Sequence, residues 1–360
     1  MLIRIKLPSG YTILGLPTEN AYGGGWDLGP TWNYILLDDK PFLVDTGKFN
    51  MGGRLLEMMR SAGVRGEEID FVMVTHGHED HDGSLAEIVE STGVLVKGLD
   101  IYDRLIRIYP NRRRSDGKNN FPASCWRCFM PETFTKKNCI EYQRARSRLK
   151  IDPIEGKCNK LTESTLVYHV PGHSPDSLAI FVLDEAVLVG DTVLPDITPW
   201  PSQEAFFDQV HEILKPRYPD AESIYGLRAY IKSLVKLKEL GKSMNDLIVL
   251  PAHRLFYHDQ WNEIDLPTRV DELIQHHIQR CGDILKILEK GPRTAREIAV
   301  AYFKEPLLSG VGILLAENEI ISHCELLNAC GDTVVEGREK FTATGSMDFE
   351  SAILSLEPDW

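Results

Sequence analysis

The segment Thr75-His76-Gly77-His78-Glu79-Asp80-His81 is the most informative part of this 360-residue chain. It follows the apolar run of residues 71–74, which predicts a buried strand leading into a loop. Imidazole nitrogens and carboxylate oxygens are ligands that Zn²⁺ and related metals accept. Because four such side chains lie within six residues on a strand-to-helix loop, they can converge on a small volume. The segment therefore predicts a metal site at the end of a strand.

Three later residues extend this set. They are His173 in Pro-Gly-His-Ser, Asp191 in Val-Gly-Asp-Thr and His253 in Leu-Pro-Ala-His, and each follows an apolar, strand-like run. Taken singly, they have ordinary interpretations as an exposed loop histidine, a turn-forming aspartate and a buried histidine. Following residues 75–81 in this order, they instead predict a site for two metal ions at the ends of strands, where loops gather.

These motifs, with Val-Asp-Thr-Gly at 44–47, resemble the metallo-β-lactamase-fold superfamily across most of residues 1–260. The resemblance implies an αββα sandwich in a catalytic domain over residues 1–265. It implies one metal held by His76, His78 and His173, a second held by Asp80, His81 and His253, and Asp191 bridging both. The ions would be two divalent metals, with Zn favoured and Fe or Mn as alternatives.

A metal pair of this kind predicts hydrolytic chemistry. A water between two cations loses its proton near neutral pH, and the resulting metal-bound hydroxide can attack a carbonyl or a phosphorus. Asp80 is the candidate catalytic residue, because it can orient the hydroxide as well as bind metal. Asp45 and Thr192 are candidate partners of the ligands, although structural roles are equally open for them. Flavodiiron-type oxidoreductases usually carry Glu at the position of His78, so hydrolysis is favoured.

The C-terminal part predicts a separate winged-helix-like domain over residues 268–360. A helix over 269–289 is followed by the stop Gly291-Pro292, a capping box of Thr294 and Glu297, and strand-like runs at 331–336 and 340–344. Residues 277–299, and residues 190–202 together with 226–240, resemble the lactamase-beta-like, hydroxyacylglutathione hydrolase-like subfamily. That subfamily is associated with thioester hydrolysis and with RNA cleavage. Because residues 268–360 are not basic, a lid or a dimer contact is favoured over nucleic-acid binding.

Charge is distributed unevenly. The chain has a formal charge of −13, yet residues 101–150 carry 13 Lys or Arg against 4 acidic residues. This stretch lies in an insert at about 98–163, between the strand-like residues 93–97 and 165–170. Arg112, Arg113 and Arg114, with the rings of Tyr109 and Phe121, are candidate anion-binding residues for CoA phosphates or an RNA backbone. A solvated surface is the alternative.

Seven cysteines are too few for a dense disulfide framework in a chain of this length, which favours a reducing cytoplasm. The spacing of Cys125, Cys128, Cys139 and Cys158 would allow a structural zinc site, with independent thiols as the alternative. The remaining cysteines are expected to be core residues; they are Cys281, Cys324 and Cys330. Trp200 and Tyr257 are candidate pocket walls, with core packing equally open.

The leading hypothesis is a dinuclear-metal thioesterase acting on a small acyl-CoA or acylglutathione-like substrate. The alternative is a metal-dependent endoribonuclease with RNA as substrate. A binding protein with a vestigial site is disfavoured, because all seven ligands are present. We expect no membrane partner, because no window approaches the roughly 18 apolar residues of a spanning helix. A homo-oligomer is compatible with the sequence.

Overall fold

The computed structural model describes residues 2–20, 25–107, 136–244, 246–310, 312–336 and 340–359. Its first sheet has seven strands that lie side by side in chain order. The first four are antiparallel, and the last four are mutually parallel. These strands are β1 Ile3–Lys6, β2 Thr12–Thr18, β3 Thr31–Leu36, β4 Phe42–Val44, β5 Phe71–Met73, β6 Leu95–Leu99 and β7 Ile151–Ile154.

The second sheet has five strands in the order β12-β11-β10-β9-β8. Four of them are antiparallel neighbours, and β12 pairs in parallel with β11. Their bounds are β8 Cys158–Lys160, β9 Thr165–His169, β10 Leu178–Val182, β11 Ala186–Gly190 and β12 Ile248–Pro251. A short hairpin of β13 Phe256–Tyr257 and β14 Gln260–Trp261 follows.

Side-chain alternation explains why the two sheets form the middle of a sandwich. In β5, Phe71 and Met73 face the second sheet, whereas Val72 faces the outer helices. In β10, Ile180 packs between the sheets, and Phe181 packs against the helices of the opposite layer. Each sheet therefore buries both faces, and the architecture is the αββα sandwich that the sequence predicted.

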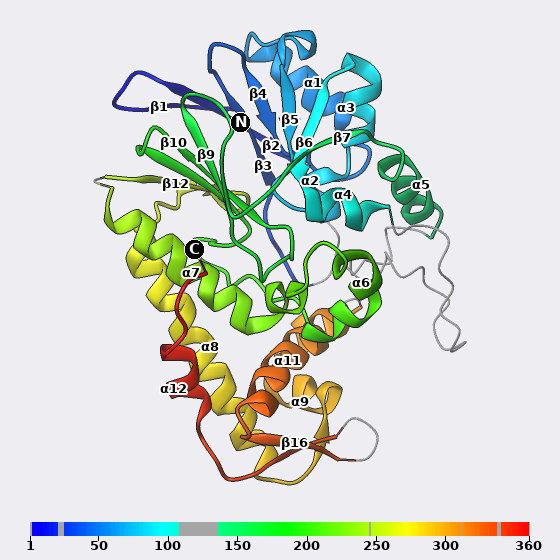
Figure 1. Cartoon of the computed structure of the whole chain (residues 1–360), viewed down its shortest axis with the longest axis vertical. Helices are drawn as coiled ribbons and strands as arrows, with labels where there is room; N and C mark the ends of the chain where they lie inside the picture. Colours follow the sequence, from blue (N-terminus) through cyan, green and yellow to red (C-terminus); the bar gives the residue numbers. More distant parts are fainter. Residues whose placement is uncertain are drawn as a thin grey trace.

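Helices cover the two outer faces (Figure 1). The first sheet carries α1 Gly52–Ser61 and α3 Leu85–Thr92, with the 3₁₀ turn Gly66–Glu68 between them. Near its β6 and β7 edge lie α4 Asp100–Ile106 and α5 Lys136–Arg146, whereas the short helix α2 Glu79–Asp82 contacts β3. The second sheet is covered by α7 Gly226–Lys242 and α8 Leu266–Leu288. Between β11 and α7 lie the 3₁₀ turns Glu204–Phe206 and Ala221–Ile224 and the helix α6 Phe207–Leu214.

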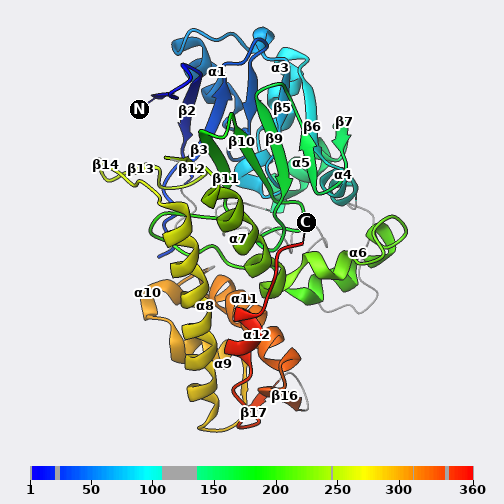
Figure 2. The ribbon, with the colours of Figure 1, turned by 60° about the vertical axis from the view of Figure 1, so that its left-hand side comes forward.

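The C-terminal elements form the lower part of the molecule in Figures 1 and 2. The helices are α8, α9 Ala295–Tyr302, α10 Glu305–Leu308, α11 Gly312–Ala329 and α12 Phe349–Leu354, and the strands β15 Arg293–Thr294, β17 Lys340–Ala343 and β16 Thr333–Glu336 form a small sheet. Thr294 and Glu297 form the expected capping box at the start of α9. One hydrophobic core runs from the second sheet into these helices, so this region is packed onto the sandwich.

The basic segment at about 98–163 is less separate than the sequence predicts. Within it, α4 and α5 pack near the first sheet, β7 is the seventh strand of that sheet, and β8 is the edge strand of the second sheet. Much of the described part of this segment is therefore integral to the sandwich. Every helix within the described ranges is too short or too polar to cross a bilayer.

Candidate metal centre

Seven predicted metal ligands lie together at one edge of the sandwich. His76 and His78 lie in the loop after β5, and Asp80 and His81 lie in the short helix α2 that follows. The other three come from the loop after β9, the end of β11 and the end of β12; they are His173, Asp191 and His253. The two sheets meet at this edge, where the Leu178 amide donates to the Thr75 carbonyl over 2.9 Å.

The seven side chains form two groups that share Asp191. In the first, His76, His78, His173 and Asp191 each present one ligand atom, and these atoms lie within 4.8 Å of one another. The His78 Nδ1 atom lies 3.0 Å from His76 Nε2 and 3.0 Å from His173 Nε2. Asp191 Oδ2 lies 3.5 Å from His173 Nε2.

The second group contains Asp80, His81, Asp191 and His253, again with ligand atoms within 4.8 Å of one another. His253 Nε2 lies 3.2 Å from Asp80 Oδ2 and 3.3 Å from Asp191 Oδ1. His81 Nε2 lies 3.4 Å from Asp191 Oδ2. The two oxygens of Asp191 thus face both groups, which is the placement that a bridging ligand requires.

The buried polar atoms of this centre fit metal ions. His81 Nε2, His253 Nε2 and Asp191 Oδ1 are buried and receive no well-formed hydrogen bond from any residue in the described ranges. Leaving such atoms unsatisfied costs about 1–3 kcal/mol each. A cation between them would satisfy all three at once. The donor set of imidazole nitrogens and carboxylate oxygens suits Zn²⁺ and also Fe or Mn.

The electrostatics differ between the two groups. Burial lowers the pKa of His78 to about 3, and burial likewise holds the pKa values of His76 and His173 below the usual range. These three rings are therefore neutral, which is the form that binds metal.

The second group favours positive charge. Burial opposes protonation of His253, but the carboxylates of Asp191 and Asp80 raise its pKa to about 9. Burial also opposes protonation of His81, and the same carboxylates with Asp45 raise its pKa well above the usual value. Two carboxylates are thus balanced by protons in the metal-free centre. A divalent cation would supply that charge in their place.

Hydrogen bonds to the far ring nitrogens leave the Nε2 atoms directed at the centre. His81 Nδ1 donates to Asp45 Oδ2 over 2.8 Å, and His173 Nδ1 donates to the Trp200 carbonyl over 2.9 Å. His253 Nδ1 lies 3.3 Å from the Pro30 carbonyl oxygen. Partners of this kind fix the tautomer and orientation of a metal-binding histidine.

The sequence indicated Asp45 and Thr192 as candidate partners of the metal ligands, and the structure adds Asn20. Asp45 contacts His81 and also accepts the Thr75 amide over 2.8 Å. Thr192 contributes its carbonyl to the Tyr230 hydroxyl over 2.8 Å, while its own hydroxyl has no partner among the described residues. Sequence reasoning missed Asn20, whose Nδ2 donates to Asp80 Oδ2 over 2.9 Å. A lone Asn after a strand carries no pattern that would reveal this contact.

We expect Asp45→Asn to weaken metal binding about 10- to 100-fold, as loss of a partner to a ligating histidine typically does. An amide accepts at one atom where the carboxylate accepts at two, so the side chain of Asp45→Asn cannot accept from both the Thr75 amide and His81 Nδ1, and the support that directs His81 Nε2 toward Asp191 is weakened. Competition with a chromophoric chelator measures the affinity. Asp38→Asn is the matched control, because Asp38 accepts hydrogen bonds from Thr162 and Ser164 outside the centre. Equal affinities of Asp45→Asn and the unmodified protein would contradict this role.

A second buried network supports the metal loop from behind. Asp82 follows His81 and accepts hydrogen bonds from the hydroxyls of Tyr102, over 2.9 Å, and Tyr142. Arg146 of α5 lies 3.4 Å from Asp82 Oδ2 and donates to the Gly77 carbonyl over 3.3 Å. Helix α5, at the end of the basic segment, is therefore attached directly to the loop that carries four of the candidate ligands.

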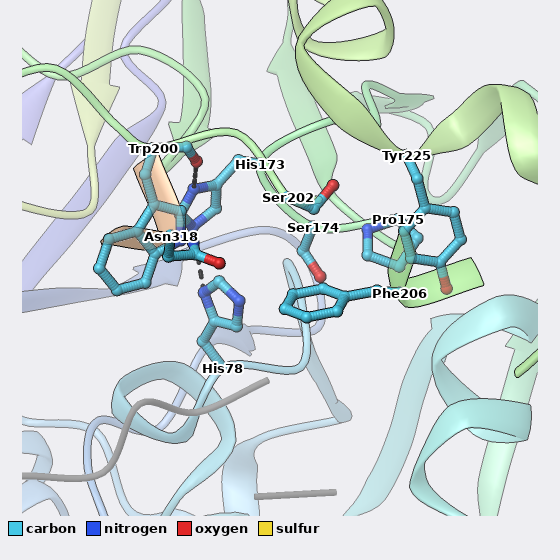
Figure 3. Close-up of a pocket in the computed structure, with 9 residues that line it drawn as sticks. All are labelled: His78, His173, Ser174, Pro175, Trp200, Ser202, Phe206, Tyr225 and Asn318. Carbon is cyan, nitrogen blue, oxygen red and sulfur yellow. Dashed lines mark hydrogen bonds between the residues drawn. The ribbon is translucent and has the colours of Figure 1, made fainter. Parts of the chain in front are cut away.

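A pocket opens beside His78 and His173 (Figure 3). Its other lining residues are Ser174, Pro175, Trp200, Ser202, Phe206, Tyr225 and Asn318. Of the two residues that were candidates for either a pocket wall or core packing, Trp200 lines this pocket, whereas Tyr257 does not and bonds through its hydroxyl to Asp27. Asn318 belongs to α11, so the C-terminal region contributes one wall.

Two attachments hold the C-terminal region against the centre. The Glu325 carboxylate on α11 accepts the amides of Glu204 over 2.7 Å and Ala205 over 3.1 Å. The Trp26 indole donates to the Leu307 carbonyl over 2.7 Å. Both contacts join segments more than a hundred residues apart in the chain. Local sequence patterns therefore do not predict them.

Glu325 predicts a pH dependence of stability. Burial raises the pKa of Glu325 to about 7 from its ordinary value of 4.5. Between these two pH values, Glu325 is protonated in the folded chain and ionised in the unfolded chain. The free energy of unfolding should therefore fall as pH rises through this window, by about 2 kcal/mol after allowing for partial exposure. Glu325→Gln should flatten that part of the profile in urea titrations. Retention of the full slope in the variant would assign it to other groups.

Several predicted residues lie outside the described ranges. These are Arg112, Arg113, Arg114, Tyr109, Phe121, Cys125 and Cys128. Of the other proposed zinc ligands, Cys139 is buried in α5 and disulfide-bonded, while Cys158 is an exposed free thiol on β8. A disulfide sulfur offers no thiolate to a metal, so Cys139 is not a zinc ligand in this structure. The predicted four-cysteine zinc site otherwise stays a prediction, because Cys125 and Cys128 lie outside the described residues. Cys281 and Cys324 are core residues as expected, and Cys330 is partly buried.

Comparison with known proteins identifies the family. The model of the metallo-beta-lactamase superfamily matches residues 26–253. The chain is 23% identical to a beta-lactamase-like protein 2 homolog of Caenorhabditis elegans, over 74% of this chain and 68% of that protein. It is 24% identical to the lactamase-like protein aptB of Emericella nidulans, over 77% of this chain and 72% of that protein.

Solved structures show the same fold. A metallo-beta-lactamase family protein of Thermus thermophilus superposes with a TM-score of 0.65 at 21% identity, covering 92% of this chain and 98% of its own. A beta-lactamase domain protein of Burkholderia ambifaria gives a TM-score of 0.66 at 20% identity, covering 95% and 93%. The chain belongs to the metallo-beta-lactamase superfamily, and it is a hydrolase of that superfamily with a candidate dinuclear metal centre.

Proposed function

We propose that the protein hydrolyses a small acyl thioester, such as an acyl-CoA or acylglutathione-like substrate, at a dinuclear zinc centre. The observation that carries the proposal is the pocket beside His78 and His173, whose described lining contains no Lys, Arg, Asp or Glu. An acyl group can enter such a pocket without loss of charge solvation, whereas a phosphodiester backbone brings a charge at every nucleotide.

The side chains have distinct roles in this proposal. Neutral His76, His78 and His173 would hold one ion, Asp80, His81 and His253 the other, and Asp191 both. Two ions held there would lower the pKa of a water molecule between them and polarise the substrate carbonyl.

The charge and position of Asp80 suit a role with the attacking water. Burial opposes ionisation of Asp80, but neighbouring His81 and His253 hold its pKa below the usual range, so it is an acceptor at neutral pH. Asn20 fixes its Oδ2 atom. Asp80 can therefore orient a water for attack on the carbonyl carbon, after which the C–S bond breaks and the thiolate leaves. A thiolate is a good leaving group and needs no strong general acid.

The test is an assay of the metal-loaded full chain against acyl-CoA, acylglutathione and single-stranded RNA. We expect thioester turnover and its loss in Asp80→Ala. Metal-dependent cleavage of RNA without thioester turnover would overturn the proposal and favour the endoribonuclease alternative, with the basic segment as the RNA contact. Measuring bound metal by mass spectrometry in the same samples tests zinc against iron and manganese.

A further inference from the structure

The pocket beside the metal centre has features that restrict the group entering it. On one side lie Trp200 and Asn318, and on the other Phe206, Pro175 and Tyr225, with His78 and His173 between them (Figure 3). Trp200, Phe206, Tyr225 and Pro175 are four of the nine described lining residues. Such surfaces bind apolar groups by excluding water, and they do not compensate a buried charge.

Most of the polar groups in this wall are already engaged. The Ser174 hydroxyl donates to Asp176, and the Ser202 hydroxyl donates to the Gly172 carbonyl over 2.7 Å. These bonds hold the loops that carry His173 and Trp200. The hydroxyls of the two serines therefore stabilise the pocket loops. Among the described lining residues, the side-chain amide of Asn318 is the better candidate for a hydrogen bond to a ligand.

Asn318 is 2% exposed, and its Oδ1 atom accepts a hydrogen bond from Gln203 Nε2. The group that Asn318 can offer a ligand is therefore the Nδ2 amide, a donor. An uncharged oxygen, such as a carbonyl or hydroxyl on the substrate, is the matching acceptor. The donor is held rigidly, because Glu325 on the same helix binds the backbone amides of Glu204 and Ala205 beside Gln203.

We propose that this pocket binds the acyl portion of the substrate, that it selects uncharged, largely apolar acyl groups, and that Asn318 of α11 is a specificity-determining residue. The kinetic test of this inference rests on the proposed thioesterase function, whereas the binding preference of the pocket can be measured without turnover. The C-terminal region, in this view, contributes directly to substrate choice. A carboxylate at the end of the acyl chain would lose its water in the pocket and find no cationic side chain among the described lining residues, while an ion held by His78 and His173 would be engaged by the thioester carbonyl at the other end of the acyl group.

The experiment compares two acyl groups of equal backbone length, butanoyl and succinyl, on whichever thiol carrier supports turnover. We expect kcat/KM for the butanoyl thioester to exceed that for the succinyl thioester by about 10-fold or more, the scale on which pockets discriminate by desolvation. Asn318→Asp should lower kcat/KM for the butanoyl thioester by about 10-fold, mainly through KM, because it buries a charge in the wall. The matched control is Asn328→Asp, the same change at an exposed position of the same helix, which should leave both values unchanged.

A calorimetric titration with butyramide and succinamate, which differ by one terminal carboxylate, measures the same preference without turnover, and unmodified protein suffices if Asn318→Asp does not fold. Tighter binding of butyramide with no hydrolysis of any thioester would uphold the pocket assignment and overturn the proposed function. Hydrolysis of both thioesters with equal or better use of succinyl would uphold the function and overturn the assignment. Equal effects of Asn318→Asp and Asn328→Asp on kcat/KM would show that Asn318 does not determine specificity.

Discussion

Asp191→Ala will reduce the metal content of the purified protein from two ions to one or fewer and lower kcat/KM by about 10³-fold or more, the scale of losing metal-assisted hydrolysis. Asp191 is the one residue common to both candidate ligand groups in the described ranges. Its two oxygens face His253 on one side and His81 and His173 on the other. Removing them therefore damages both sites at once, whereas loss of any one histidine damages one.

Two comparisons make this result specific. Asp39→Ala removes an exposed carboxylate from the turn between β3 and β4 and should leave metal content and rate unchanged. Unmodified protein stripped of metal by a chelator should match Asp191→Ala in rate and recover when metal is returned, while the variant should not recover. An Asp191→Ala protein that still holds two ions would show that the two groups do not share this residue.

The sequence indicated the fold because its decisive patterns are local. Residues 71–81 combine a buried strand with a ligand-rich loop, and the apolar runs of β9, β10, β11 and β12 are long enough to be recognised. The same locality explains why the sequence did not reveal that part of the basic segment belongs to the two sheets. Strands β7 and β8 are short, and β7 contains Pro153, so neither shows the apolar pattern of a strand.

The parts of the site that the sequence did not indicate depend on contacts between distant segments. The partners of His173 and His253 are the backbone carbonyls of Trp200 and Pro30. Because every residue has a backbone carbonyl, the residue types at these positions do not predict the contacts. Asn318 lies more than a hundred residues along the chain from Gln203, its partner at the pocket. Asp82 is one of three acidic residues in 79–82 and has no distinguishing sequence pattern, although its environment is a buried cluster of two tyrosines and an arginine.

That cluster leads to the second large effect, a loss of stability in Arg146→Leu. Asp82 is 1% exposed, and Arg146 is the cation facing it in the described structure. Removing one partner of a buried ion pair leaves an uncompensated charge and typically costs about 3–5 kcal/mol. We expect a fall of this size in the free energy of unfolding measured with urea, together with weaker metal binding, because Arg146 also contacts Gly77 between two candidate ligands.

The controls separate the charge from the packing of α5. Arg144→Leu makes the same change at an exposed position two residues away and should cost little. Combining Arg146→Leu with Asp82→Asn should recover part of the loss, since the buried charge is then absent. If the double variant loses as much free energy of unfolding as Arg146→Leu and Asp82→Asn lose in total, packing and not charge holds α5 to the metal loop.

The pH dependence of the Arg146→Leu deficit provides an independent check. Burial already raises the pKa of Asp82 above its usual value despite the opposing effect of Arg146. Without Arg146 the pKa should rise further, so the folded variant holds a proton that the unfolded chain gives up as pH increases. The deficit should therefore be small below the unfolded pKa of about 4 and grow with rising pH. A deficit that is the same at pH 4 and pH 8 would mean that Arg146 stabilises the loop through its contact with Gly77 and not through Asp82.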